Sequence, residues 1–441
     1  MQRQRNIFSW LVLCSVFALF TIAPNRGLAT ETMKDLPNPA RVILAKAGKL
    51  IKDKEYGKAI TLLVDFQAQG SKAGEAESRG CLHAEVYATL GTCYLFDNKF
   101  AQAARNLDLA LQKDPRYLSA LQNRAKAAYE LHDYPKAAES FAKAYEAAPE
   151  KNPEHLYFAA VAYLLAKDNK KSIALFEKIL SSHPDKFRPE WRENLVHTLL
   201  AAGENRRALP HIAELSGLSA QTKLIPRDIR ELSETSRDAK QVQWQEILLQ
   251  QYLLLDMESE ALTLVDMLTA RTPTEPKWWR ALVHLHLQHN RYQPALAALL
   301  ITGYLEPLSE QEKRLTADLY LQLGVPHQSV PVYENMLKEK NNPQLLTNLI
   351  IALQQTGQTA QALAALEKFA PATISPELSM LKADLLYGLG KYKDAAHLYR
   401  KAADAGAGKQ RDRALQMAEY AKVQAGNEHG FSDRRVRTAT F

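Results

Sequence analysis

The chain has 441 residues, enough for two or three globular domains or for one elongated repeat domain. Hydrophobic residues make up 46% and charged residues 24%, which excludes wholesale disorder, and the abundance of Ala and Leu favours helices over strands. The formal net charge of +7 falls by three, to +4, without Arg3, Arg5 and Arg26. Apart from the basic clusters Lys46–Lys58 and Arg434–Arg437, the other Lys and Arg residues alternate with Asp and Glu, a distribution that argues against nucleic acid as the partner.

The first 29 residues have the pattern of an export signal. Arg3 and Arg5 provide a positive start, residues 7–23 form an apolar run, and Gly27-Leu28-Ala29 places small residues at the positions that specify cleavage. We predict a signal peptide of the Sec type over residues 1–29, cleaved after Ala29, and a periplasmic location. Because the apolar run approaches membrane-spanning length, an N-terminal anchor that stays uncleaved and faces the periplasm is the alternative. Membrane contact is expected only through this segment.

Residues 40–73 form the first candidate pair of helices, and Gly74, Ser78 and Gly80 mark a loop that follows over residues 74–83. Two cysteines lie next, Cys81 at the start of a predicted helix and Cys93 within it. At 1.5 Å per residue they are about 18 Å apart, whereas a disulfide needs Cα atoms within roughly 7 Å. The spacing predicts two free or buried thiols.

A pattern with a period of 34 residues begins at Ala84. Leu90-Gly91 and Tyr94 are followed by Phe100, Ala103, Leu107, Ala110 and Pro115, and the frame recurs as Ala125, Tyr134, Ala137, Phe141, Ala144 and Pro149, and then as Ala160, Tyr163, Phe176 and Pro184. These residues resemble the tetratricopeptide repeat. The structural positions that the resemblance assigns in this chain are Gly91, Tyr94, Ala103, Pro115, Ala125, Ala137, Phe141, Pro149, Ala160, Tyr163, Trp279, Ala295 and Ala395.

Helix packing gives a physical reason for this pattern. Two antiparallel helices need small residues where their backbones approach and large residues in the adjoining gaps, and a Pro marks the boundary to the next pair. One such hairpin cannot bury its own apolar face, whereas stacked hairpins bury a continuous core. The sequence therefore predicts an all-α solenoid of tetratricopeptide-like hairpins, a right-handed superhelix by resemblance, with about ten repeats and a C-terminal capping helix.

The units divide into two predicted sub-arrays. The N-terminal sub-array covers residues 40–218, with units at 40–73, 84–117, 118–151, 153–186 and 189–218. Residues 219–241 are highly charged and are either an irregular linker or a degenerate repeat. The C-terminal sub-array covers residues 242–425, with units that begin near 242, 276, 310, 343 and 376 and a capping helix from about Lys409 to Ala425. We expect residues 426–441 to be a disordered tail.

The chain lacks the motifs of catalysis. It contains no Gly-rich phosphate loop, no GxSxG elbow and no HExxH pair. His286 and His289 share a helical face, but no Cys or acidic ligand lies at helical spacing with them, so no metal site is predicted. The prediction is a protein that is not an enzyme and has no catalytic residues, no metal and no cofactor.

Two adjacent tryptophans begin the unit at 276. Trp279 falls where the repeat family carries its large aromatic residue on the first helix, so we expect Trp279 in the core. Trp278 is then the more exposed of the two, where it could anchor a partner.

In the repeat family the first helix of each hairpin lines the concave surface. The resemblance therefore implies a protein-binding face at Lys126, Tyr129, Tyr157, Lys277, Arg280, His284, Arg314, Asp318 and Asn348. This mixture of aromatic and polar groups suits an extended peptide or the edge of a folded protein. Some family members bind a peptide's terminal carboxylate with Lys, Asn and Arg at set places; that full combination is absent here, so no such clamp is predicted.

The C-terminal half resembles the tetratricopeptide proteins associated with TonB–ExbB–ExbD energy transduction. The shared features are Trp279-Arg280-Ala281-Leu282, Tyr292 with Ala295-Leu296, Asp318-Leu319-Tyr320 and Val325-Pro326, in that order. The resemblance implies a scaffold that acts as an accessory of such a transport system, with TonB, ExbB or ExbD among its partners. The alternative is an assembly factor for envelope machinery such as polysaccharide export, a pilus or a secretin. An enzyme with a site in residues 217–241 is a third reading, but that segment has neither Cys nor His.

Overall fold

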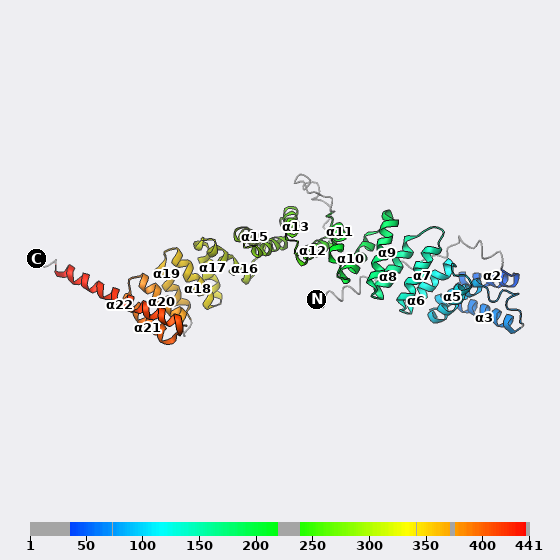
Figure 1. The fold of residues 1–441 in the computed structure, drawn as a ribbon, viewed down its shortest axis with the longest axis horizontal. Helices are drawn as coiled ribbons and strands as arrows, with labels where there is room; N and C mark the ends of the chain where they lie inside the picture. The colour runs from blue at the N-terminus through cyan, green and yellow to red at the C-terminus, as the bar shows by residue number, and fades with distance from the viewer. Residues whose placement is uncertain (1–35, 73, 219–238, 341, 371–374, 438–441) are drawn as a thin grey trace. The chain divides into compact units, whose positions relative to one another are not determined.

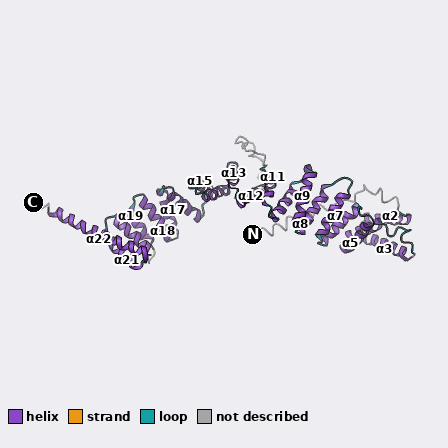
Figure 2. Cartoon of the chain, viewed as in Figure 1, coloured by secondary structure: helices purple, strands orange, loops and turns teal. Residues whose placement is uncertain are grey.

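The computed structural model describes residues 36–72, 74–218, 239–340, 342–370 and 375–437, with side chains as far as Gly426. Over these residues the secondary structure consists of 21 α-helices and one short 3-10 helix (Figures 1 and 2). The prediction of an all-α hairpin array is confirmed. The predicted signal peptide, 1–29, and nearly all of the charged segment 219–241 lie outside the described residues, so both remain predictions.

The chain divides into two compact units, each of which is described by itself. The first unit ends within the first part of α12, and the second contains the rest of α12 and everything after it. Helices of the first unit are α2 (Asn38–Lys52), α3 (Tyr56–Lys72), α4 (Ala84–Phe96), α5 (Phe100–Lys113), α6 (Leu118–Glu130), α7 (Tyr134–Ala147), α8 (Pro153–Leu165), α9 (Asn169–Ser182), the 3-10 helix η1 (Pro184–Lys186), α10 (Pro189–Ala201), α11 (Asn205–Leu215) and the start of α12 (Ala239–Leu254).

The second unit repeats the same alternation. Its helices after α12 are α13 (Glu258–Arg271), α14 (Pro276–Gln288), α15 (Tyr292–Leu305), α16 (Glu310–Gln322), α17 (Pro326–Glu339), α18 (Pro343–Gln355), α19 (Thr359–Phe369), α20 (Pro376–Gly388), α21 (Tyr392–Ala405) and α22 (Gly408–Arg437). In the described part of the chain, no helix combines the length and the hydropathy that crossing a membrane requires.

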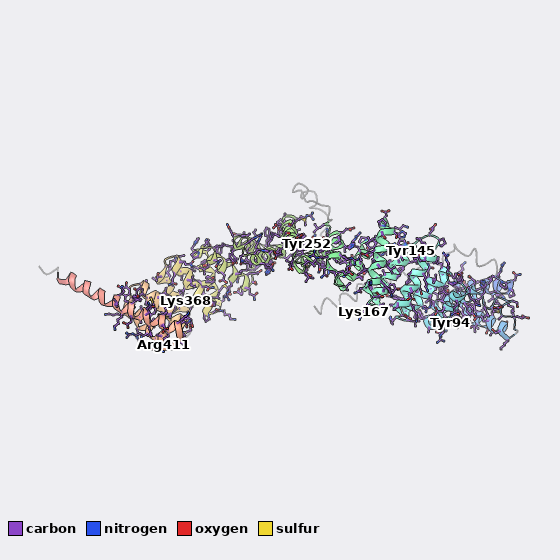
Figure 3. The ribbon with its side chains drawn as sticks, viewed as in Figure 1. Tyr94, Tyr145, Lys167, Tyr252, Lys368 and Arg411 are labelled. Atoms are coloured by element: carbon purple, nitrogen blue, oxygen red, sulfur yellow. The ribbon has the colours of Figure 1, made fainter. Side chains whose placement is uncertain are left out.

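One residue with a positive φ joins the two helices of each hairpin. The ten residues are Lys54, Asn98, His132, Lys167, Gly203, Asp256, Asn290, Gly324, Gly357 and Gly390. The left-handed conformation ends one helix and lets the chain reverse into the next, although it costs an L-residue such as Lys167 (labelled in Figure 3) roughly 1–2 kcal/mol. The described residues therefore contain ten hairpins, consistent with the predicted number of repeats.

Small residues allow the helices within a hairpin to approach closely. A Cβ atom at Gly91 would lie 2.6 Å from Leu107 Cγ and 3.2 Å from the carbonyl oxygen of Ala103, so the approach of α4 to α5 requires glycine. Ala103 and Leu107 are themselves completely buried. Cys93 lies in α4 and Cys81 just before it, and both are buried free thiols.

The C-terminal helix is longer than the sequence predicted. α22 begins near the expected residue and packs Ala414, Ala418 and Ala421 as its buried face, so it covers the last hairpin. However, it continues to Arg437, whereas we expected disorder from Gly426. No Pro interrupts this stretch, so nothing in it forces the helix to end.

Candidate functional site

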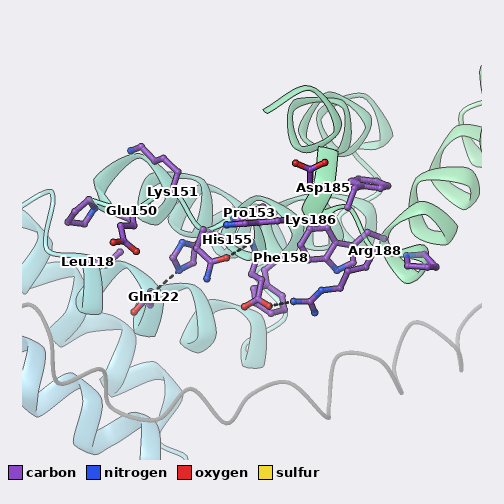
Figure 4. A pocket seen from close by; sticks show the side chains of 17 residues that line it. Leu118, Gln122, Glu150, Lys151, Pro153, His155, Phe158, Asp185, Lys186 and Arg188 are labelled. Carbon is purple, nitrogen blue, oxygen red and sulfur yellow. Dashed lines mark hydrogen bonds and ion pairs between the residues drawn. The ribbon is translucent and has the colours of Figure 1, made fainter. Parts of the chain in front are cut away.

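A groove of about 1100 Å³ lies in the first unit, across the N-terminal ends of three successive first helices. Leu118 and Gln122 of α6 form one end, and Trp191 of α10 lies at the other. Between them lie the linker that precedes α8, the first turns of α8 and the linker that precedes α10 (Figure 4). The repeat itself builds this groove, because each hairpin places the start of its first helix beside the next.

Local sequence determines how these helices begin. The side chain of Asn152 caps α8 by accepting a hydrogen bond from the backbone nitrogen of Glu154 at 2.9 Å, and Pro153 takes the first helical position. α6 and α10 begin at Tyr117 and Arg188 without a side-chain cap. The first turn of α6 therefore lacks a side-chain cap at the edge of the groove, whereas in α10 Pro189 has no N–H and the backbone N–H of Trp191 donates to the carbonyl oxygen of Arg188.

The floor of the groove is aromatic. The ring of Tyr157 stacks on that of Trp191 with centroids 4.8 Å apart, and Phe158 packs against Tyr157 at 5.6 Å. The Tyr157 hydroxyl accepts a hydrogen bond of 3.0 Å from the Asn194 side chain, and burial raises the pKa of Tyr157 to about 12. Tyr157 was predicted as a partner-contacting residue, but it is only 3% exposed because Trp191 of the following hairpin covers it. Its role is to support the floor.

His155 leaves a polar atom unsatisfied in this floor. Its Nε2 lies 2.8 Å from Gln122 Nε2, and because an amide nitrogen only donates, the ring nitrogen accepts. Burial lowers the pKa of His155, so the ring is neutral and carries its hydrogen on Nδ1. That Nδ1 has no hydrogen-bond partner among the described residues, although the residue is only 7% exposed. An unpaired buried donor costs roughly 1–3 kcal/mol.

Charged residues of both signs surround the groove. Arg188 forms an ion pair of 2.7 Å with Glu154, and its guanidinium lies 5.1 Å from the centre of a Trp191 ring (Figure 4). Lys151 donates to the carbonyl oxygens of Tyr145 and Glu146 at 3.1 and 2.7 Å, at the end of α7. The exposed residues Glu150, Asp185 and Lys186 complete the rim. An aromatic floor with a rim of mixed charge suits a polypeptide segment of mixed polarity.

The other two residues predicted on α6 lie outside this groove. Lys126 is half-buried, and Tyr129 packs edge-on against Tyr134 with ring centroids 5.6 Å apart. Burial raises the pKa of Tyr129.

In the second unit, Arg280 braces three elements. Its guanidinium bonds Glu312 of α16, with Nε 2.5 Å from a carboxylate oxygen, and also bonds Glu306, which follows α15. Glu312 in turn closes a capping box with Ser309 at the start of α16. The hydrogen bonds that Arg280 and Ser309 donate lower the pKa of Glu312 to about 2, and the hydrogen bonds that Glu312 and Glu306 accept from Arg280 raise the pKa of Arg280. The predicted binding residue Arg280 is therefore occupied by structural contacts.

Three further predicted residues meet in one network. Asp318 of α16 accepts hydrogen bonds from Tyr333 Oη at 2.6 Å and from Asn348 Nδ2 at 3.0 Å, and Arg314 Nε lies 3.5 Å from its carboxylate. Tyr333 was not predicted, yet it is fully buried. The same Asp–Tyr pair recurs 66 residues later as Asp384 and Tyr399, at 2.5 Å. The repeated separation of 15 residues is the sequence signal that could have revealed it.

The tryptophan prediction was wrong. Trp278 is the buried residue, 3% exposed, whereas Trp279 is half-buried and donates its indole hydrogen to the carbonyl oxygen of Pro273 at 2.8 Å. The ammonium of Lys277 lies 4.8 Å from the ring centre of Trp278. His284 is the remaining predicted residue of α14, and it is exposed.

The histidines of α14 do not gather metal ligands. His289 Nε2 lies 2.9 Å from a carboxylate oxygen of Glu258, and nowhere in the described ranges do three or more His, Cys, Asp or Glu side chains come together as a metal would require.

Burial raises the pKa of the Cys93 thiol to about 12.

Comparison with known families identifies the repeats. The model of the tetratricopeptide repeat matches residues 89–152, 123–187 and 347–410, so both units contain tetratricopeptide repeats. The first two matches include α6, α8 and the linkers that build the groove, and the third includes Asn348. The chain thus contains tetratricopeptide repeats, which in general form non-enzymatic scaffolds for other proteins.

Solved structures are similar at low sequence identity. A tetratricopeptide repeat protein from Parabacteroides merdae is 16% identical over 60% of this chain and 98% of its own, with a TM-score of 0.29. A structure of Naa15/Naa10 bound to HypK-THB is 17% identical over 87% of this chain and 66% of its own, with a TM-score of 0.40. Yeast Tom70 is 14% identical over 87% of this chain and 96% of its own, with a TM-score of 0.28. No curated protein matches the sequence.

Proposed function

We propose that this protein is a non-enzymatic scaffold that holds a segment of a partner protein in the groove of α6, α8 and α10. The observation that carries the proposal is the unsatisfied Nδ1 of His155, a residue that lines a groove bordered by the uncapped start of α6. A partner backbone offers carbonyl oxygens to such donors, and its side chains would cover the rim. Because the scaffold is already folded, little ordering entropy falls on its side of binding.

We also propose where the scaffold acts and with which class of partner. The export pattern of residues 1–29 supports a mature periplasmic protein that begins after Ala29. The ordered motifs between Trp279 and Pro326 support an accessory role in a TonB–ExbB–ExbD system. In this proposal the second unit meets the energy-transduction proteins while the groove of the first unit holds the polypeptide that they serve.

Photocrosslinking in intact cells tests both statements. A photoreactive residue replaces Lys186 on the groove rim, or exposed His284 on α14, and the adducts are identified by mass spectrometry. Arg280 is unsuitable because its replacement would break the contacts with Glu306 and Glu312. Exposed Lys113 at the end of α5 is the matched control.

The adducts separate the possible outcomes. A discrete adduct at Lys186 that is absent at Lys113 supports the groove as the binding site. Recovery of ExbB, ExbD or TonB at His284 supports the accessory role, whereas recovery of only secretion or polysaccharide-export components contradicts it and favours envelope assembly. Cell fractionation and the intact mass of the chain test export: a periplasmic product that begins at Thr30 is expected, and a cytoplasmic product with the intact N-terminus contradicts the proposal.

A further inference from the structure

One helix of the first hairpin presents a row of lysines away from the core. Lys46, Lys49 and Lys52 are all exposed on α2, at spacings of three residues that keep them on one side of the helix. Val42 and Ala45 lie on the same side, within about one turn before Lys46, and Val42 is 54% exposed. The opposite side of α2 carries the buried Ala40 and Ala47, which pack into the hairpin.

These three lysines have no carboxylate partner in the described part of the chain. Elsewhere in the first unit exposed basic residues are commonly paired, as in Lys136 with Asp133, Lys171 with Asp168 and Arg207 with Glu177. From residue 36 to residue 72, seven basic residues face only three acidic ones. A terminal hairpin needs a polar outer face for solubility, but that need is met by either sign of charge. Solubility therefore does not explain why the charges on this face of α2 are all positive.

Apolar residues exposed among lysines match one kind of surface. An interfacial helix places a few apolar side chains between the headgroups while its lysines extend their ammonium groups toward the phosphates. The apolar run of residues 7–23 precedes α2 by residues 24–37, a stretch that spans at most about 50 Å when extended. This reach applies to the chain that keeps its N-terminal segment; in the chain that begins at Thr30, only the charge and exposure of α2 direct it to the lipid surface.

We infer that the lysine face of α2, formed by Val42, Ala45, Lys46, Lys49 and Lys52, binds the anionic phosphate headgroups of a lipid bilayer. This contact is separate from the groove of the first unit and does not depend on the partner held there. It extends the sequence-based expectation, which confined membrane contact to the N-terminal segment. Its function is to orient the first hairpin against the membrane.

An environment-sensitive fluorophore on the face itself tests this inference. Val42→Cys is labelled in the full-length chain that also carries Cys14→Ser, since Cys81 and Cys93 are buried and protected from the label. Vesicles of phosphatidylethanolamine and phosphatidylglycerol should shift the emission to the blue, and vesicles of phosphatidylcholine alone should not. Because the label reports contact at α2, an N-terminal anchor that holds the chain on both kinds of vesicle does not by itself produce the shift. High salt should abolish it, since the Debye length falls from about 8 Å at physiological ionic strength to about 3 Å at 1 M.

Charge-removing variants give the size of the effect. Each basic residue near an anionic surface contributes roughly a fivefold factor, so Lys46→Gln, Lys49→Gln and Lys52→Gln together should raise the half-saturating lipid concentration about a hundredfold. The control combines Lys113→Gln, Lys143→Gln and Lys401→Gln, which remove the same charge from other exposed positions and should leave the response unchanged. An equal response to phosphatidylcholine, or an unaltered response in the first triple variant, overturns the inference. A shift caused by polyglutamate but not by anionic vesicles also overturns it and indicates an acidic protein as the partner.

Discussion

The two units use the same hairpin, but the groove lies in the first unit and the linked network of Asp318 lies in the second. In the first unit the starts of α6, α8 and α10 enclose a groove in which His155 Nδ1 has no partner. In the second unit Asp318 of the first helix α16 accepts hydrogen bonds from Tyr333 and Asn348, although Gln251 Oε1 of α12 and Arg271 Nε of α13 have no hydrogen-bond partner among the described residues. Buried polar groups that are fully paired rigidify a structure, whereas an unpaired group is stabilised when a ligand supplies the missing partner. In our proposal the groove of the first unit binds the partner, and the network of Asp318, Tyr333 and Asn348 braces the second unit.

Acid should separate the units most strongly, because burial lowers the pKa values of three histidines in the first unit and of His286 in the second. Burial, with help from the charge of Lys240, lowers the pKa of His197 to about 4, and burial also lowers those of His155 and His211. Below the unfolded value of 6.5 the unfolded chain binds protons that the folded chain does not, so the free energy of unfolding falls as the pH drops from about 6.5 to 4. For His197 alone the loss approaches about 3 kcal/mol.

Hydrogen exchange of α10 and α20 at pH 7 and pH 5 measures this difference. Protection of α10 should fall first, and His197→Phe should remove much of its pH dependence. His397→Phe, at an exposed position of the second unit, is the control. Equal acid sensitivity of α10 and α20 would contradict the contrast between the units.

Substitutions at one repeat position test how far the units share a scaffold. Ala103 in α5 and Ala395 in α21 occupy equivalent positions, and both are completely buried. Ala103→Leu and Ala395→Leu should each lower the free energy of unfolding by about 1–3 kcal/mol through overpacking. Chemical denaturation checks this, with exposed Ala101→Leu in the same helix as the matched control. If Ala103→Leu unfolded at the parental denaturant concentration, the assigned register of that hairpin would be wrong.

Removing one hydroxyl tests the bracing network of the second unit. Tyr333→Phe deletes the hydrogen bond to the Asp318 carboxylate without creating a cavity, and should lower the free energy of unfolding by about 1.5 kcal/mol. Tyr399→Phe should act alike through Asp384, while Tyr304→Phe, at a side chain that is 90% exposed, should have no effect. Urea denaturation of the three variants measures these differences. Loss of binding at the Lys186 crosslinking position in Tyr333→Phe would contradict the division of roles.

The sequence predicts the scaffold better than the groove, for physical reasons. Hairpin turns and close helix approaches depend on local residues such as Gly91 and Gly390, so the spacing of small residues reveals the repeats. Whether a polar side chain finds a partner depends on neighbours one hairpin away: Gln122 and His155 are 33 residues apart. Periodicity alone therefore does not show that His155 Nδ1 is unsatisfied.

The tryptophan error has a related cause. One residue turns an α-helix by about 100°, so a register shift of a single residue exchanges the buried and exposed positions in a first turn. Trp278 and Trp279 exchanged places in this way. The pattern of the first helix predicts Arg280 as a polar residue that faces a partner. Its glutamate partners lie in the α15–α16 linker and in α16, so a pattern within one helix does not predict these contacts.

The smallest expected change in stability bears most directly on binding. His155→Phe replaces the ring by one without a donor, while Gln122 is half-exposed and remains solvated. Removing the unpaired Nδ1 donor should raise the free energy of unfolding by about 1 kcal/mol, because its desolvation penalty disappears. The same change should weaken crosslinking at Lys186, since the partner loses the donor that the groove offered. His284→Phe, at an exposed position of the second unit, should alter neither quantity. A more stable variant that still captures the partner would show that His155 is a packing residue, whereas a less stable one would show that Nδ1 already has its partner in the free protein.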